Sequence, residues 1–129
     1  MIKIVFCLRR QPELSPEAFQ DYWLAHHAAL VKDRARMLGI RRYVQSHTIR
    51  DSRLGGLAEQ RGFCGEPFDG VAELWFDAPE VLYPNDQAPD WAIKAARDLL
   101  EDENKFIDLA NSPIFVAREH EILPFAGTA

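Results

Sequence analysis

Apolar and polar residues alternate along the first segment of the chain, residues 2–9. Large apolar side chains occupy every second position from Ile2 to Leu8, and the charged residues Lys3 and Arg9 fall between and after them. A period of two places alternate side chains on opposite faces of a strand, so this pattern predicts a β-strand. Three later segments also have extended character and predict further strands: 40–49, 68–77 and 113–122.

Two other segments carry apolar residues at steps of three and four, which is the spacing of one face of an α-helix. The first begins at Ser15-Pro16-Glu17, which supplies an N-cap hydroxyl, a proline at the first helical position and an acid in the first turn. It is expected to end near Leu38-Gly39, because glycine readily adopts the left-handed conformation that closes a helix. The second predicted helix covers residues 90–109.

These elements follow the order β-α-β-β-α-β, which is the split βαβ arrangement of ferredoxin-like domains. We predict an α+β fold in a single domain over residues 1–129, with a four-stranded antiparallel sheet and both helices on one face. The glycine-containing segment 50–67 is predicted to be a long loop, and loops of this length in a small domain are usually functional or mobile.

The alternation also sorts the strand residues between two faces of the predicted sheet. The helices are expected to cover an apolar set: Ile2, Ile4, Phe6, Leu8, Val44, Ala72, Leu74, Phe76, Ile114 and Val116. The opposite face is expected to carry a mixed set: Val5, Cys7, Tyr43, Gln45, His47, Asp69, Val71, Glu73, Trp75, Phe115, Ala117 and Glu119.

An uncovered second face would leave several aromatic side chains in water. We therefore predict a symmetric homodimer that buries this face, while a monomer with a half-polar open sheet is the alternative. Where two such faces meet imperfectly, a cavity with an apolar lining and a few polar groups would remain for a small molecule.

Composition and charge narrow the range of partners. The 129 residues carry a formal net charge of −5 without a basic cluster, which argues against binding to nucleic acid or to anionic lipid. No segment approaches the roughly 20 apolar residues that span a bilayer, and no cleavage-site pattern follows the first apolar run. Cys7 and Cys64 match no metal spacing, so we expect free thiols in a cytoplasmic protein.

Several short motifs follow one another along the chain. They are Phe19, Tyr22-Trp23 and His27 in the first helix, Tyr43-Val44-Gln45-Ser46-His47, residues 68–76, residues 101–108 and Glu119-His120. As an ordered set, these motifs resemble the EthD-like proteins of the dimeric α/β-barrel group, and the resemblance covers almost the whole chain. It implies a homodimer formed by sheet-to-sheet packing, with a pocket between each sheet and its own helices or its partner.

The resemblance does not fix a reaction, because one fold supports many activities. Similar proteins include polyketide dehydratases, lactone isomerases and a protein linked to ether degradation, and the wider group also contains monooxygenases and haem-binding enzymes.

The candidate catalytic residues are His27, His47 and Tyr43. Imidazole titrates near neutral pH, which suits acid–base chemistry, and His27 lies on the same side of the helix as Trp23, four residues earlier. The alternative for His27 is a core histidine bonded to a backbone carbonyl. Six further residues are predicted to bind the substrate: Trp23, Gln45, Asp69, Glu73, Trp75 and Phe115.

Asp69 and Glu73 each allow two interpretations. A carboxylate buried beside Trp75 would have a raised pKa and could transfer protons. However, an Asp-Gly pair at 69–70 also suits a turn at the start of a strand, and Glu73 could form a structural ion pair with Arg9 or Arg41.

No metal and no cofactor are predicted. The adjacent residues His26 and His27 would point roughly 100° apart on a helix, no His-Glu-x-x-His or Cys-x-x-Cys motif is present, and no phosphate-binding glycine loop precedes a helix.

We expect an enzyme that acts on a small apolar oxygenated compound, such as an aromatic polyketide, a phenol or a lactone. The expected chemistry is proton transfer without a cofactor, in a dehydration, an isomerisation or an oxidation. The alternatives are a non-catalytic accessory or binding dimer of a degradative pathway and a haem-dependent monooxygenase.

Overall fold

Four antiparallel strands form one sheet in the computed structural model, which describes residues 1–82 and 87–127. The strands are β1 (Ile2–Leu8), β2 (Arg42–His47), β3 (Gly70–Phe76) and β4 (Ile114–Ala117). They lie in the order β2-β3-β1-β4, so the first and third strands occupy the centre. This arrangement confirms the predicted ferredoxin-like sheet, although β4 is shorter than the predicted strand over 113–122.

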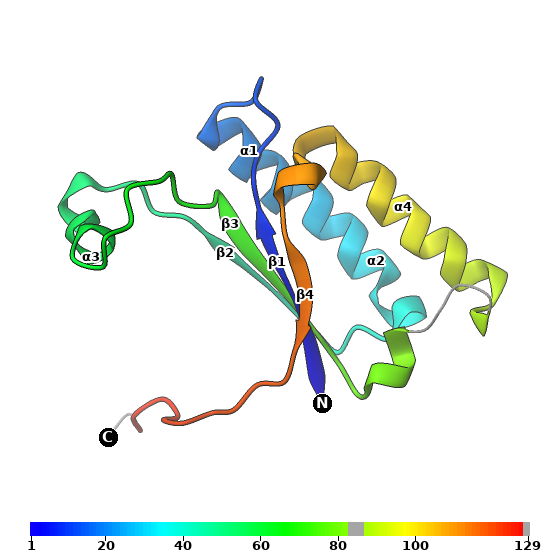
Figure 1. Ribbon diagram of the computed structural model, residues 1–129. Helices are drawn as coiled ribbons and strands as arrows, with labels where there is room; N and C mark the ends of the chain where they lie inside the picture. Colours follow the sequence, from blue (N-terminus) through cyan, green and yellow to red (C-terminus); the bar gives the residue numbers. More distant parts are fainter. Residues whose placement is uncertain (83–86, 128–129) are drawn as a thin grey trace.

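The helices cover one face of this sheet (Figure 1). The first helical segment consists of α1 (Pro16–Tyr22), the π-helical turn η1 (Trp23–His27) and α2 (Ala28–Leu38). The hydroxyl of Ser15 caps its start by accepting a bond from the backbone N–H of Ala18 at 3.0 Å, and Gly39 ends it with a φ of 73°. The second long helix is α4 (Asp90–Phe106).

Strand register decides which side chains share a face, because directly opposite residues of an antiparallel pair project to the same side. Tyr43 lies opposite Leu74, Gln45 opposite Ala72 and His47 opposite Gly70. Ala72 belongs to the core under the helices, and Leu74 packs against it. The prediction that Tyr43, Gln45 and His47 lie on the open face was therefore wrong.

Val44 shows the same error from the other side, because it lies opposite Glu73 and faces away from the helices. The register agrees with the other assignments in β1 and β3, for example Phe6 opposite Ala72 and Val5 opposite Glu73. Ile114 and Val116 of β4 were expected to be covered by the helices, but both are more than half exposed. A shift of one residue in a strand moves every side chain to the other face, so one misplaced strand displaced three candidate site residues together.

Hydrogen bonds explain why β2 turns its polar side chains inward. The amide nitrogen of Gln45 donates to the backbone carbonyl of Trp23 at 2.9 Å and to the hydroxyl of Tyr43 at 2.8 Å. Nε2 of His47 lies 2.7 Å from the amide oxygen of Gln45, so it is the donor of that bond. Buried polar groups with partners avoid most of the cost of leaving water.

Glycine at position 70 allows the ring of Trp23 to lie against the start of β3. A Cβ atom there would fall 2.4 Å from Cζ3 of Trp23 and 2.7 Å from the carbonyl oxygen of Ser46. The indole also stacks on the ring of His47, with centroids 4.4 Å apart. Trp23 is thereby fixed between helix and sheet.

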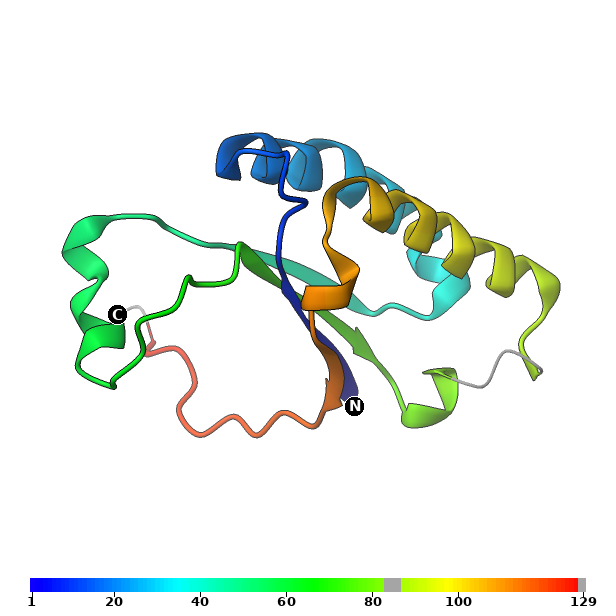
Figure 2. The same ribbon diagram turned by 45° about the horizontal axis from the view of Figure 1, so that its top comes forward.

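The segment predicted as a loop over 50–67 contains two short helical turns, η2 (Ser52–Leu54) and α3 (Gly56–Glu59). This segment and the tail after β4 both extend away from the side of the sheet that carries α1, α2 and α4 (Figures 1 and 2). Two further short turns are η3 (Pro79–Leu82) and η5 (Leu109–Asn111). Within the described residues, no helix has both the length and the apolar character needed to cross a membrane.

Candidate functional site

His27 ends the π-helical turn and is buried between the helices and the sheet, with 5% of its surface exposed. In this turn the N–H of Ala28 bonds to the carbonyl of Trp23, five residues back, and that carbonyl also accepts the bond from Gln45. Single π-helical turns are rare and occur often at functional sites. Here the turn holds Trp23 and His27 toward the same interior space.

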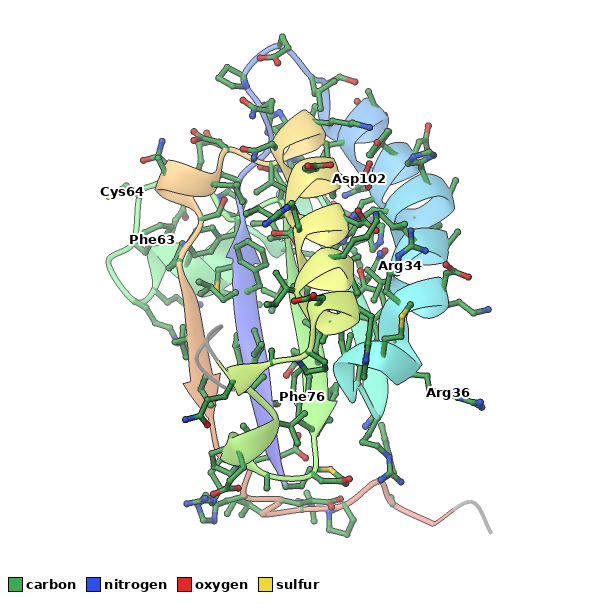
Figure 3. All side chains as sticks on the ribbon, turned by 90° about the vertical axis from the view of Figure 1, so that its right-hand side faces the viewer. Arg34, Arg36, Phe63, Cys64, Phe76 and Asp102 are labelled. Carbon is green, nitrogen blue, oxygen red and sulfur yellow. The ribbon has the colours of Figure 1, made fainter. Side chains whose placement is uncertain are left out.

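Asp102 of α4 is the hydrogen-bond partner of His27, at 2.7 Å between Oδ2 and Nδ1. Its other oxygen accepts a bond from the hydroxyl of Tyr22 at 2.5 Å, and Figure 3 shows Asp102 between α4 and the first helical segment. Burial favours a higher pKa for Asp102, but the bonds from Tyr22 and His27 outweigh it and lower the pKa. Asp102 is therefore ionised at neutral pH.

His27 is neutral in this setting. Burial lowers the pKa of His27, and the opposing attraction of Asp102 does not cancel that effect. Because the carboxylate of Asp102 can only accept, the proton of the neutral ring lies on Nδ1. Nε2 is then a free base, and no described side chain forms a hydrogen bond with it.

A small cavity of about 40 Å³ lies beside His27. Its lining is mainly apolar and comes from both helices and three strands: Phe6, Leu8, Trp23, His27, Val31, Tyr43, Ala72, Leu74, Leu99, Glu103 and Ile107. A volume of this size is close to that of one water molecule in the liquid, about 30 Å³. His27, Tyr43 and Glu103 are its titratable residues.

Burial beside this mainly apolar cavity raises the pKa of both Glu103 and Tyr43. Burial raises the pKa of Glu103 to about 7, and the negative charge of Asp102 contributes further. Burial also raises the pKa of Tyr43, against the hydrogen bonds from Gln45 and Trp23 that lower it. The cavity therefore combines a free imidazole nitrogen, a carboxyl that can hold a proton near neutrality and a neutral phenol.

The structure brings five of the predicted site residues to this interior region. His27, Tyr43 and Trp23 line the cavity, while Gln45 and His47 join them through the hydrogen bonds and stacking described above. Burial lowers the pKa of His47. The sequence also allowed His27 to be a core histidine bonded to a backbone carbonyl. In the structure, its Nδ1 contacts a carboxylate instead.

Trp75, Glu73 and Phe115 lie on the opposite face of the sheet. Glu73 forms an ion pair with Lys3 at 2.5 Å, rather than with Arg9 or Arg41. The ring of Trp75 is covered by Lys3, 5.1 Å from its centroid, and by the guanidinium of Arg42 at 4.6 Å. Phe115 remains half exposed on β4. These residues do not border the cavity beside His27.

Asp69 also lies outside the cavity, at the N-terminal end of β3. Its carboxylate is paired with Arg10 at 2.7 Å and with Arg50 at 2.5 Å. Burial favours a higher pKa for Asp69, but the backbone and side-chain bonds from Arg10, together with Arg50, lower it. This network joins the end of β1 to the segment after β2, which agrees with a structural role for Asp69.

A second, wider hollow of about 520 Å³ borders Asp69 at the surface. Several of its other polar side chains have partners as well: the guanidinium of Arg9 donates to the carbonyls of Glu66 and Pro67 and stacks on Phe68 at 4.1 Å. The charged groups of Arg9 and Asp69 in this hollow are therefore already bonded to other groups of the protein.

Sequence reasoning did not assign roles to Tyr22, Asp102 and Glu103. A signal was available in the helical spacing, because Asp102 and Glu103 lie three and four residues after the core residue Leu99. Acids at that spacing fall on the buried side of a helix, where they require partners.

No group of three or more metal-ligating side chains in range to hold one ion occurs among residues 1–82 and 87–127.

Known proteins resemble this chain in sequence and in structure. A family model described as the EthD domain matches residues 11–110. A family protein of the ethyl tert-butyl ether D type from Bacillus halodurans superimposes with a TM-score of 0.61 at 20% identity, covering 93% of this chain and 99% of that one. No curated protein matches the sequence.

Two other solved structures have the same fold at lower identity. A dimeric protein of unknown function with a ferredoxin-like fold, from Bacteroides fragilis, has a TM-score of 0.57 at 9% identity, covering 92% of this chain and 95% of that one. A putative antibiotic biosynthesis monooxygenase from Deinococcus radiodurans has a TM-score of 0.50 at 12% identity, covering 98% and 100%.

Proposed function

The chain belongs to the EthD domain family, and from that premise we propose that it catalyses proton transfer on a small apolar oxygenated compound, with His27 as the general base. The observation that carries this proposal is the pairing of neutral His27 with ionised Asp102 beside an apolar cavity. The reaction class is a dehydration or an isomerisation, which needs neither an oxidant nor a nucleotide cofactor.

Asp102 supports the base in two ways. Its bond to Nδ1 holds the proton there, which leaves Nε2 as the atom that accepts a proton from substrate. Its negative charge also stabilises the imidazolium that forms when Nε2 takes that proton. Tyr22 fixes the other oxygen of the carboxylate and so keeps the pair aligned.

Tyr43 is proposed to orient a substrate oxygen, because it lines the cavity and the hydrogen bond from Gln45 fixes its hydroxyl. His47 would act through Trp23, on which it stacks, and Trp23 would form one wall of the binding site.

Substrate must displace side chains to enter. Cavities that hold organic ligands usually measure about 300–1,000 Å³, whereas the space beside His27 measures about 40 Å³. The lining residues from α2 and α4, such as Val31 and Leu99, are the ones whose separation would enlarge it. The function therefore includes an opening of the gap between these helices.

We also propose a cytoplasmic homodimer that forms through the open face of the sheet. Support comes from the half-exposed Phe115 on that face and from the dimeric relative of the same fold. Nucleic acid and membranes are not proposed as partners.

The proposal can be tested by native mass spectrometry of the protein from its source cells, followed by assays on the molecule that accompanies it. We expect a dimer mass with a bound organic compound, and His27→Ala should lose essentially all turnover of that compound because the base is gone. His120→Ala, which removes an exposed histidine, is the matched control and should retain the wild-type rate. Full turnover by a folded His27→Ala protein would refute the role of His27.

Two alternative functions give different results in the same assays. An accessory binding protein would retain ligand affinity in His27→Ala and form no product in any variant. A haem-dependent monooxygenase would show Soret absorbance on addition of haem; the Deinococcus radiodurans protein is described as a putative antibiotic biosynthesis monooxygenase.

A further inference from the structure

Glu103 is a half-buried acid that the proposed function leaves without a role. It follows Asp102 on α4 and borders the same cavity as His27. No hydrogen bond or ion pair joins its carboxyl to another described side chain. A carboxyl in such a position is costly to ionise, and it is stable there as the neutral acid.

We propose that Glu103 is the catalytic acid of this site: it holds a proton on the α4 side of the cavity and gives it to a carbonyl or hydroxyl oxygen of the substrate, while His27 takes a proton from the adjacent carbon. This inference rests on the proposed function and extends it by naming the second group and the substrate class. The substrates are carbonyl compounds that carry hydrogen on the carbon next to the carbonyl.

The groups around Glu103 favour the protonated form. Asp102 on its own helix is ionised, Tyr43 on β2 is a neutral phenol and His27 on η1 is a neutral imidazole. β1 and β3 present only apolar side chains to the cavity: Phe6, Leu8, Ala72 and Leu74. Lys105 of α4 and His26 of η1 each lie 3.7 Å from the carboxylate of Asp102, but no described cation pairs with Glu103 itself. Burial together with Asp102 therefore raises the pKa of Glu103 to about 7.

The two residues then carry complementary protonation states before substrate arrives. Nε2 of His27 is unprotonated at neutral pH, and the carboxyl of Glu103 holds a proton in the pH range below about 7. An acid and a base held near their operating pH are the combination that concerted proton transfer requires.

The electron flow balances without an oxidant or reductant. Nε2 of His27 removes the proton from the carbon, and the C–H electron pair forms a C=C bond. In an enolisation the carbonyl oxygen takes the proton of Glu103, and return of a proton to another carbon completes an isomerisation. In a dehydration the C–O bond of a β-hydroxyl breaks, and that proton leaves with the hydroxyl as water.

The protonation state is tested by carbon-13 NMR of the full chain labelled at the glutamate carboxyl carbons. One glutamate should titrate with a midpoint of about 7, and this signal should disappear in Glu103→Gln. Glu101→Gln changes an exposed glutamate of the same helix and should leave it in place. A Glu103 that titrates near 4.5, the ordinary value for glutamate, would overturn the inference.

The catalytic role is tested with acetophenone, a small aromatic ketone, by following exchange of its methyl hydrogens for deuterium in D₂O. The wild type should accelerate exchange, with a rate that falls as pH rises through about 7. Glu103→Gln should lower the rate about 10²-fold or more and abolish this fall, because general acid catalysis contributes about 10²–10⁴-fold. Glu101→Gln should behave as the wild type.

The two proposals fail in different ways. If Glu103→Gln matches the wild type while His27→Ala is inactive, the acid role is wrong and the base role stands. If His27→Ala retains the full rate, the proposed function is wrong, whatever the titration of Glu103. A wild type that does not accelerate the exchange would contradict carbonyl compounds as the substrate class.

Discussion

At the scale of single residues, the site depends on how Trp23 is held. Its ring lies over Gly70 and stacks on His47, and its backbone carbonyl takes a bond from Gln45. Each of these contacts limits where the π-helical turn and hence His27 can lie. Gly70 therefore helps to fix the position of Trp23 just as His47 and Gln45 do, although it has no side chain.

Replacing Gly70 by Ala should destabilise the protein by about 1–3 kcal/mol, because the added methyl group overlaps both the indole of Trp23 and the carbonyl of Ser46. Gly56→Ala is the matched control, since nothing lies within 4 Å of a Cβ atom there. Urea denaturation measures both free energies of unfolding. Equal stability of the two variants would show that Trp23 is not confined by position 70.

At the scale of elements, α4 brings two acids to the interior, and their charges differ. Asp102 is stabilised as an anion by hydrogen bonds from Tyr22 and His27. Glu103 is the next residue of the helix and receives no such hydrogen bonds, so burial raises its pKa with little opposing effect. One turn of helix thus supplies both the support for the base and the proposed acid.

This difference predicts a stability change with pH at Glu103. The pKa of Glu103 is raised from its ordinary value of 4.5 to about 7 in the folded chain. The neutral acid therefore contributes to the free energy of unfolding. This contribution is complete below about pH 4.5 and is lost as pH rises through about 7. At roughly 1.36 kcal/mol per pH unit, the loss between pH 4.5 and about 7 is at most about 3.4 kcal/mol.

Glu103→Gln keeps the neutral shape at every pH. It should therefore be more stable than the wild type at about pH 8, by about 1–3 kcal/mol, and equally stable at about pH 4.5. Burial of His27 has the opposite effect, because the lowered pKa of His27 costs stability as pH falls below 6.5. Comparison of the two proteins at the same pH by chemical denaturation removes that contribution. A variant less stable than the wild type at about pH 8 would contradict the protonated state.

At the scale of the whole molecule, the sheet has one covered and one open face. The helices bury the covered face (Figure 1). The open face carries the apolar residues Val5, Val71 and Phe115, beside the ring of Trp75 over which the charged group of Lys3 lies. An apolar area beside polar residues is typical of an interface between subunits.

Phe115→Glu should convert the proposed dimer into monomers, because it places a charge in the proposed interface. Leu24→Glu is the matched control, since Leu24 is also an exposed apolar residue, on the helical side. Analytical ultracentrifugation at several protein concentrations gives the masses. A Phe115→Glu protein that sediments like the wild type would place the interface elsewhere.

The sequence by itself determined the order of elements, the antiparallel sheet with its helices on one face, and the ends of the first helix. Local rules suffice for these features: the period of two in β1, the cap at Ser15 and the left-handed Gly39 act between neighbours in the chain. Helical spacing also placed His27 on the side of Trp23, whereas Tyr43 became a candidate on a strand face that the register reversed.

Only the tertiary structure decided which face of the sheet carries the site. Because Val44 is apolar, the sequence indicated that its side of the strand faces the helices. In the structure, Tyr43, Gln45 and His47 face the helices instead. Their hydrogen bonds to one another and to the π-helical turn offset the cost of burial. Those partners, like the partnership of His27 with Asp102 seventy-five positions away, exist only after the chain has folded, so no local pattern could reveal them.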